Sequence, residues 1–219
     1  MYEKYVKRIA DIIFSFLVLV LLMPIWLVVA SIIVLNSPGN PIFMQERVGL
    51  GGKTFTLYKF RTMISDAFKY GKGFYFDGED DWRITPVGKV LRKLSLDEIP
   101  QLFNVLKGDM SIIGPRPMLP YQHDYLSEEQ RQRFAVRPGI TGLAQVSGRN
   151  NLPWSQRIEL DIEYVNDLSF CMDISIAVTT ITACFEKRDI SYDISRDEIE
   201  DFMSKEVSGN EHNGKESSS

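Results

Sequence analysis

The stretch LRKLSLDEIPQLFNVLKGDMSIIGPRP, residues 91–117, decides how the rest of this chain is organised. Two adjacent carboxylates, Asp97 and Glu98, stand at the start of an apolar pattern with helical spacing. A basic pair that begins at Arg92 lies one turn upstream, and a rigid Gly-Pro-Arg-Pro turn places Arg116 downstream. Acidic side chains beside cations, with turns that fix both, are typical of chemistry on phosphate groups.

The two acids allow two interpretations. Ser95 and Glu98 form a capping-box pattern, in which the acids only cap a helix over about residues 97–107. Pro100 fits only the first turn of a helix, so we expect the helix to begin at Asp97 or Glu98 rather than at Ser95. In the second interpretation, the helix N-terminus keeps Asp97 ionised as a nucleophile on phosphorus, while Glu98 helps to hold Mg2+. The spacing alone leaves both interpretations open.

Composition indicates one domain with an unevenly distributed charge. The chain has 219 residues, which is enough for one hydrophobic core, and a net charge of -4. Ten acidic against five basic side chains fall in residues 186–216, so the middle of the chain is free to present a basic face to phosphates. Cys171 and Cys184 lack metal or redox spacing, and we expect both to be small buried hydrophobes.

Residues 12–35 form an uncharged, largely apolar run that only Ser15, Pro24 and Ser31 interrupt. Its length is that of a membrane helix, and no small-residue cleavage site of a secretory signal follows it. Pro24 lies at the centre of the run. Because the proline ring clashes with the preceding turn and removes a hydrogen-bond donor, we expect at least a kink there.

Basic residues flank this run on both sides: Lys4, Lys7 and Arg8 precede it, and Arg47, Lys53, Lys59 and Arg61 follow it. Because basic residues prefer the cytoplasmic side, a straight span would place one group on the wrong side. Each half of the run gives about 18 Å of helix, which is too short to cross a hydrocarbon core of roughly 30 Å. We therefore favour a re-entrant hairpin broken at Pro24 over a kinked span.

Two β-rich runs follow, residues 42–46 and 54–60, and the glycine-rich link over residues 49–52 predicts a β-hairpin between them. On an extended strand Lys59 and Arg61 face the same way, either as a phosphate clamp or as a solvated edge. The acidic run over residues 77–81 lacks the framing of a calcium loop, so we interpret it as solvated.

The second half of the chain alternates polar turns with helical patterns. Ser127 and Gln130 form another capping-box pattern that starts a short polar helix. A fixed turn carries Arg137, and Gln145 and Arg149 lie in a polar loop suited to reading a nucleotide or sugar. A helix is expected from Trp154 to about Asp167. The apolar run over residues 170–185 is either a buried helix or one lying in the membrane interface, and residues 205–219 are expected to be disordered.

Taken together, these segments resemble the bacterial sugar transferase family, the monotopic polyprenyl-phosphate phosphoglycosyl transferases, and within it the small, PglC-like type. The resemblance covers roughly residues 1–190. The matching segments are R-x-x-D at Arg8 and Asp11, the proline-broken run, Y-K-F-R-T-M (58–63), R-x-L-S-L-D-E-x-P-Q-L-x-N-V-L-x-G-D-M-S (92–111), I-G-P-R-P (113–117), R-P-G-I-T-G (137–142) and Q-V-x-G-R-N (145–150).

The resemblance implies a mainly helical α+β fold with three parts. These are a re-entrant membrane helix-break-helix over residues 1–36, a cytosolic catalytic domain with interfacial helices over residues 37–204, and the tail. It implies a monotopic protein of the bacterial inner membrane whose catalytic domain faces the cytoplasm. One departure is that the break, often Ser-Pro in the family, is Met23-Pro24 here, so no hydroxyl is present beside the proline.

The implied reaction moves a sugar-1-phosphate from a UDP-sugar, favoured as an N-acetylated amino sugar, to polyprenyl (undecaprenyl) phosphate with release of UMP. The family pattern makes Asp97 the covalent nucleophile and Glu98 its neighbour at Mg2+. We expect Lys59, Arg61, Arg92 and Arg116 to bind phosphates, and Arg137, Gln145 and Arg149 to bind nucleotide or sugar. The lipid bilayer is an expected partner and nucleic acid is not, while a homodimer is left open. The alternatives are an Mg2+-dependent phosphate-ester hydrolase and a non-enzymatic membrane adaptor.

Overall fold

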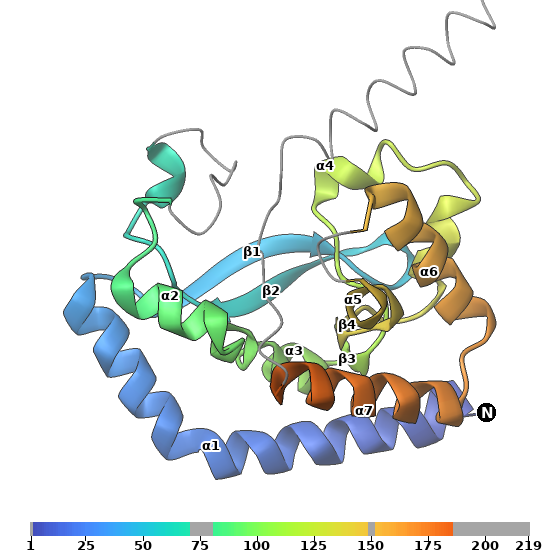
Figure 1. The fold of residues 1–219 in the computed structure, drawn as a ribbon, viewed down its shortest axis with the longest axis horizontal. Coiled ribbons are helices and arrows are strands. Elements are labelled where there is room, and N and C mark those ends of the chain that lie inside the picture. Colours follow the sequence, from blue (N-terminus) through green and yellow to red (C-terminus); the bar gives the residue numbers. More distant parts are fainter. Residues whose placement is uncertain (1, 71–80, 149–151, 186–219) are drawn as a thin grey trace, which may run out of the picture.

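The structure, a computed structural model, describes residues 2–70, 81–148 and 152–185. It is a mainly helical α+β fold, as predicted, with two small sheets of which only the β-hairpin was expected (Figure 1). In chain order the helices and strands are α1 (Arg8–Asn36), β1 (Ile42–Val48), β2 (Thr54–Phe60), α2 (Pro86–Lys93), α3 (Gln101–Lys107), β3 (Ser111–Ile113), α4 (Pro120–His123), β4 (Gly139–Thr141), α5 (Leu143–Ser147), α6 (Trp154–Asn166) and α7 (Phe170–Phe185).

The N-terminal helix α1 runs along the outside of the molecule and bends part-way along its length (Figure 1). The predicted kink is therefore confirmed. The helix is nevertheless one element that contains Pro24, and not two helices with a break between them. A proline removes one hydrogen bond of the helical ladder, so the turns on either side can continue across it. Together with the turn that precedes it, α1 is long and apolar enough to cross a membrane.

Both ends of α1 are fixed to the body formed by the other elements. At its start, the Arg8 guanidinium donates to the carbonyl oxygen of Val105 at 2.7 Å, and Asp11 accepts a hydrogen bond from the Ser111 hydroxyl at 2.7 Å. Near its end, Ile33 is buried in a cluster with Phe60 of β2. Between these contacts most of its apolar side chains are exposed.

The predicted β-hairpin is confirmed. Strands β1 and β2 are antiparallel, with Ile42 opposite Phe60 and Val48 opposite Thr54. Gly51 and Gly52 in the connecting turn have φ angles of 64° and 74°, a left-handed conformation in which a side chain would be strained. The hairpin presents one buried face to α3 and carries Lys59 near its end.

A second, two-stranded parallel sheet contains β3, which leads directly into the Gly-Pro-Arg-Pro turn. Ser111 of β3 pairs with Gly139 of β4, and Ile113 pairs with Thr141. The two chain segments approach so closely that a Cβ atom on Gly139 would lie 2.1 Å from the backbone nitrogen of Gly114. Only glycine fits at this crossing, so the turn that bears Arg116 has a fixed position.

The two C-terminal helices agree with the sequence pattern. α6 begins and ends within one residue of the prediction. On α7, Asp173 and Ile176 face inward, while Phe170, Ile174 and Val178 are exposed at helical spacing. This exposed apolar stripe argues against a fully buried helix. α7 lies beside the start of α1 (Figure 1), where the Lys7 ammonium contacts the Asp173 carboxylate at 2.7 Å.

Two expectations about surface residues were wrong. Asp81, expected in a solvated acidic loop, is buried and forms a 2.6 Å ion pair with Arg83, whose guanidinium also donates to the carbonyl oxygens of Ala67 and Tyr70. Cys171 is exposed on α7, since it falls on the outward side of that helix. Residues 77–80 of the acidic run and the tail over residues 205–219 lie outside the described residues.

Candidate active site

The two central acids lie in a short 3-10 turn, Leu96–Glu98, ahead of α3. The predicted helix start at Asp97 or Glu98 was wrong, because α3 itself begins at Gln101. The capping interpretation was also wrong. Ser95 has a φ of 54°, in the left-handed region rather than the extended conformation of a helix cap, and its side chain makes no capping hydrogen bond.

Glu98 forms the centre of an ion cluster. Its Oε1 lies 2.7 Å from the Lys59 Nζ and 3.0 Å from the Arg116 Nη2. Burial acts to raise the pKa of this carboxyl, but the two cations outweigh burial and lower the pKa to about 2. Glu98 is therefore ionised near neutral pH, and it holds two cations from distant segments in place.

Asp97 is in the opposite situation. Its side chain is buried, with 4% of the residue exposed, and its Oδ1 accepts no hydrogen bond. Burial raises the pKa of this carboxyl; Lys59 opposes the rise, and the negative charge of Glu98 adds to it. A buried carboxylate without a partner costs free energy, and groups of this kind concentrate at functional sites.

Three cations from separate elements act on the Asp97 carboxyl. Lys59 on β2, Arg92 on α2 and Arg116 after β3 each lower the pKa of Asp97 through their positive charge. All three are therefore close enough to act on this carboxyl. Arg92 is oriented by a hydrogen bond from its Nε to the Thr62 hydroxyl at 2.9 Å. The structure thus assembles three of the four predicted phosphate ligands next to the two acids.

The turn that carries Arg116 is held from two sides by residues that sequence reasoning did not assign to the site. The Arg133 Nη2 donates to the carbonyl oxygen of Arg116 at 2.9 Å and to the Asp161 carboxylate on α6. On the other side, the Arg47 Nη1 donates to the carbonyl oxygen of Pro117 at 3.2 Å. The sequence contained one sign of this arrangement: Asp161 is a charged residue on the otherwise apolar face of a predicted helix.

Arg61 has a different environment from Lys59. Its guanidinium donates to the backbone carbonyl oxygens of Ser37 and Pro38, just beyond the end of α1. These bonds tie the end of β2 to the end of α1. A role for Arg61 in phosphate binding remains a prediction.

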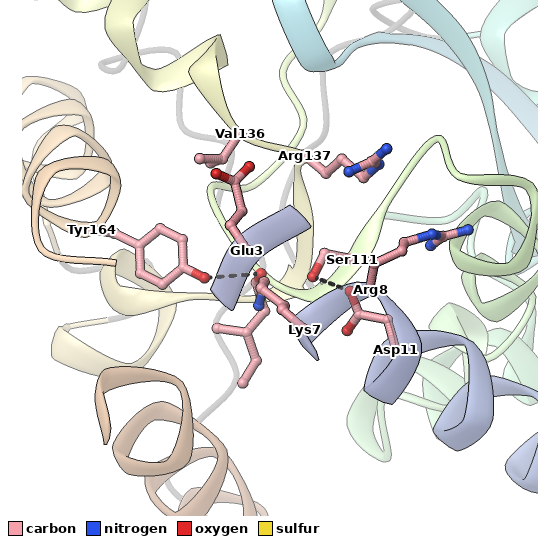
Figure 2. A pocket seen from close by; sticks show the side chains of 9 residues that line it. Glu3, Lys7, Arg8, Asp11, Ser111, Val136, Arg137 and Tyr164 are labelled. Carbon is pink, nitrogen blue, oxygen red and sulfur yellow. Dashed lines mark hydrogen bonds between the residues drawn. The ribbon is translucent and has the colours of Figure 1, made fainter. Parts of the chain in front are cut away.

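Arg137 lies at the other end of α3 from Asp97. Its Nε donates to the carbonyl oxygen of Gly108, which caps the C-terminus of that helix, at 2.9 Å. Because β3 and β4 are parallel, Arg137, which precedes β4, and Arg116, which follows β3, lie at opposite ends of this sheet. Figure 2 shows Arg137 beside Arg8 in a small pocket at the start of α1, where Asp11 points toward Ser111.

Gln145 on α5 lies on the Arg116 side of this sheet, close to the crossing of Gly114 and Gly142. Both its amide oxygen and its amide nitrogen are buried without a hydrogen-bond partner. An unpaired buried amide suits a polar ligand that would supply both bonds. Arg149, predicted to act with Gln145, lies outside the described residues.

A family model described as bacterial sugar transferase matches residues 2–187. The chain belongs to the bacterial sugar transferase family. This membership confirms the resemblance on which the sequence-based expectations rest, and it covers every residue of the site described above.

Several curated relatives are similar to this sugar transferase. The "Uncharacterized sugar transferase EpsL" of Bacillus subtilis is 47% identical over 144 residues, which cover 65% of this chain and 69% of that protein. An Aeromonas hydrophila protein named "UDP-N-acetylgalactosamine-undecaprenyl-phosphate N-acetylgalactosaminephosphotransferase" is 42% identical, over 81% of this chain and 43% of its own length. A Caulobacter vibrioides protein named "UDP-glucose:undecaprenyl-phosphate glucose-1-phosphate transferase" is 41% identical, over 80% and 68%.

The carboxylates of this sugar transferase fit a metal ion that is shared with a substrate. Within residues 2–70, 81–148 and 152–185, no three His, Cys, Asp or Glu side chains gather to form a complete metal cage. Mg2+ does not need such a cage, because it binds through one or two carboxylates together with water and substrate phosphates. Asp97, with its unpaired oxygen, and Glu98 beside it are the residues that could contribute.

Proposed function

We propose that this chain transfers a sugar-1-phosphate from a UDP-sugar to undecaprenyl phosphate through a covalent intermediate on Asp97, with release of UMP. The observation that carries the proposal is the buried Asp97 oxygen without a partner, next to the Lys59–Glu98–Arg116 ion cluster. The names of two relatives, which cite UDP-sugars and undecaprenyl phosphate, support the substrate class.

In the first step, an oxygen of Asp97 attacks the β-phosphorus of the UDP-sugar. A new bond forms between oxygen and phosphorus, the bond from the β-phosphorus to the bridging oxygen breaks, and UMP leaves with that electron pair. Lys59, Arg92 and Arg116 lie where they can offset the negative charge that builds up on the transferred group and on UMP. Burial raises the pKa of Asp97, so its ionised form is a more basic carboxylate than one in water, which favours attack.

In the second step, a phosphate oxygen of the acceptor lipid attacks the same phosphorus. The bond to Asp97 breaks and the carboxylate is restored, while the sugar leaves as the polyprenyl diphosphate sugar. Dividing the transfer in two means that the soluble donor and the lipid acceptor need not occupy the site together. Both steps use the same three cations: Glu98 holds Lys59 and Arg116, and the Thr62 hydroxyl orients Arg92.

Mg2+ is the proposed cofactor, held by Asp97 and Glu98 together with the diphosphate of the donor. When bound, it supplies positive charge to the phosphoryl oxygens and to the leaving UMP. Glu98 remains ionised for this purpose, because its pKa is about 2.

The proposed location is the inner face of the bacterial cytoplasmic membrane. In this arrangement α1 is re-entrant, so both of its ends lie on the cytoplasmic side. Support comes from the attachment of both ends of α1 to one body and from the basic residues on each side of its apolar run. Among sugars we propose an N-acetylated amino sugar, as in the name of the Aeromonas relative. Other relatives are named for glucose and galactose, so a hexose is the second candidate.

The test is UMP release by the purified full chain in nanodiscs, with a panel of UDP-sugars, Mg2+ and undecaprenyl phosphate. We expect steady release with the acceptor, a single stoichiometric burst without it, and a phosphosugar adduct on Asp97 by mass spectrometry. Asp97→Asn should lower the rate by a factor of at least about 10^3. Continuous release without acceptor would indicate a hydrolase, and full activity in Asp97→Asn would refute the nucleophile.

A further inference from the structure

An apolar groove lies between α1, α3 and the β1–β2 hairpin. Its volume is about 560 Å³, within the range of roughly 300–1,000 Å³ that small-molecule sites occupy. The walls include Trp26 from α1, Tyr58 from β2, and Pro100, Phe103 and Leu106 from α3 and the residue before it. In Figure 1, α3 lies between α1 and the hairpin.

One wall of the groove belongs to the membrane helix. Trp26 comes two residues after Pro24, and its ring packs against Phe60 at 5.1 Å and against Phe103 at 5.2 Å between ring centroids. Phe103 is 42% exposed although it is a large apolar residue. The groove is therefore continuous with the apolar surface of α1, and an occupant made of hydrocarbon could enter it without crossing water.

One wall of the groove lies close to Asp97 along the chain. Pro100 lies three residues after Asp97, which is about one helical turn or ~5 Å along the axis. A molecule that reaches Pro100 in the groove is therefore about one turn of chain from the proposed nucleophile.

The lining carries one buried polar atom that the protein does not satisfy. The Trp26 Nε1 is buried and has no hydrogen-bond partner. Because this atom has almost no exposed surface, Trp26 presents its apolar ring and not its donor to an occupant of the groove.

We propose that this groove holds the isoprene units next to the phosphate of the acceptor lipid. The inference rests on the proposed function and adds the site that selects the lipid. The aromatic walls and the opening toward α1 receive the hydrocarbon, and the phosphate is thereby directed to the Asp97 side. The groove determines how well the acceptor binds and takes no part in the attack on the donor.

Leu106→Trp tests this proposal, because a larger ring at this half-buried position would fill the groove. Two quantities are measured in nanodiscs of phosphatidylethanolamine and phosphatidylglycerol: the UMP burst without acceptor, and the undecaprenyl phosphate concentration that gives half the maximal rate. We expect an unchanged burst and an increase of at least about tenfold in that concentration. Leu21→Trp is the matched control, since Leu21 is 76% exposed on α1, and it should change neither quantity.

Phe103→Ala provides a second variant, which opens the groove instead of filling it. It should also raise the half-saturating concentration of undecaprenyl phosphate, because it removes an apolar wall of the groove. If either variant lacks the burst, its folding is at fault and the other variant decides.

The outcomes separate the two proposals. An unchanged acceptor dependence in both variants would overturn the assignment of the groove. So would an effect confined to retention of phosphatidylglycerol, which would make the groove a site for bilayer lipid. A wild-type protein without a UMP burst would instead refute the proposed function itself.

Discussion

Asp97, the proposed nucleophile, carries a cost to stability. Its carboxyl is buried and Oδ1 has no hydrogen-bond partner, while Lys59, the cation that most lowers its pKa, is bound to Glu98. The surrounding positive charges attract a phosphate without blocking the oxygen that would attack it. The buried charge that suits Asp97 to attack phosphorus therefore also lowers the stability of the fold.

Replacing this charge should stabilise the protein. The pKa of Asp97 in the folded state is raised above its ordinary value of 3.8. The folded state thus binds the proton more tightly than the unfolded state, so the penalty is complete above the folded pKa and disappears below about 3.8. We expect Asp97→Asn to have a higher Tm than the wild type in Mg2+-free buffer at pH 7.5, and the difference to shrink as the pH falls through the raised pKa.

Thermal unfolding followed by circular dichroism in matched detergent gives this comparison. Asp109→Asn is a suitable control, because Asp109 lies at the far end of α3 in a more exposed ion pair with Lys107. A Tm for Asp97→Asn below that of the wild type at pH 7.5 would contradict the argument.

At this scale, the sequence was sufficient to name residues that the structure brings together but not their bonding. Residue type and spacing singled out Asp97, Glu98, Lys59, Arg92 and Arg116 as candidates, and the family resemblance suggested their roles. Which carboxylate would take the cations and which would stay unpaired depends on side-chain geometry, which spacing does not encode. Ser95 illustrates the limit, since its pattern predicted a cap and its left-handed backbone rules one out.

Among the elements, α6 has a role beyond packing. Its Asp161 is buried beside Arg133, and burial raises the pKa of this carboxyl although Arg133 acts against the rise. Arg133 also donates to the carbonyl oxygen of Arg116. α6 therefore positions Arg116 through an arginine that touches neither Glu98 nor Asp97.

A double substitution separates stability from positioning. Asp161→Leu alone leaves a buried unpaired guanidinium, and we expect a loss of about 3–5 kcal/mol in the free energy of unfolding. The pair Arg133→Met with Asp161→Leu should recover most of that stability. Activity should stay low in the double variant, because the donor to Arg116 is still missing.

Chemical denaturation and the rate of UMP release with saturating acceptor measure the two effects. Recovery of both stability and activity in the double variant would mean that Arg133 only packs. An increase in the KM for the UDP-sugar without recovery of kcat would support the positioning role.

Elements with strong local signals were predictable, and elements set by tertiary contacts were not. The glycine link gave the hairpin, and the 3.6-residue period gave α6 within one residue. The parallel pairing of β3 with β4 joins segments of three residues each, too short for any pattern to identify. That pairing is what separates Arg137 from Arg116.

For the whole molecule, the course of α1 relative to the bilayer is the main structural proposal. A re-entrant α1 leaves Lys4 and Lys53 on the cytoplasmic side, whereas a kinked span separates them. We expect Lys4→Cys and Lys53→Cys, in a Cys171→Ser, Cys184→Ser background, to react with a membrane-impermeant maleimide only in inside-out vesicles. Both positions are exposed in the structure.

Labelling of Lys4→Cys in intact spheroplasts would favour the kinked span instead. Lys53→Cys serves as the internal reference, because it lies in the turn of the hairpin in either arrangement. The bend itself was predictable from a proline at the middle of an apolar run, whereas the continuity of the helix through Pro24 was not.

The attachment of α1 at both ends has a consequence for where the reaction takes place. Because α1 is attached to one body at both ends, it cannot move independently of that body. Asp97 and α1 therefore move together. Under the proposed function, the depth at which α1 lies in the leaflet would then set the height of Asp97 relative to the lipid headgroups. We expect an acceptor to react only when its phosphate lies at that height.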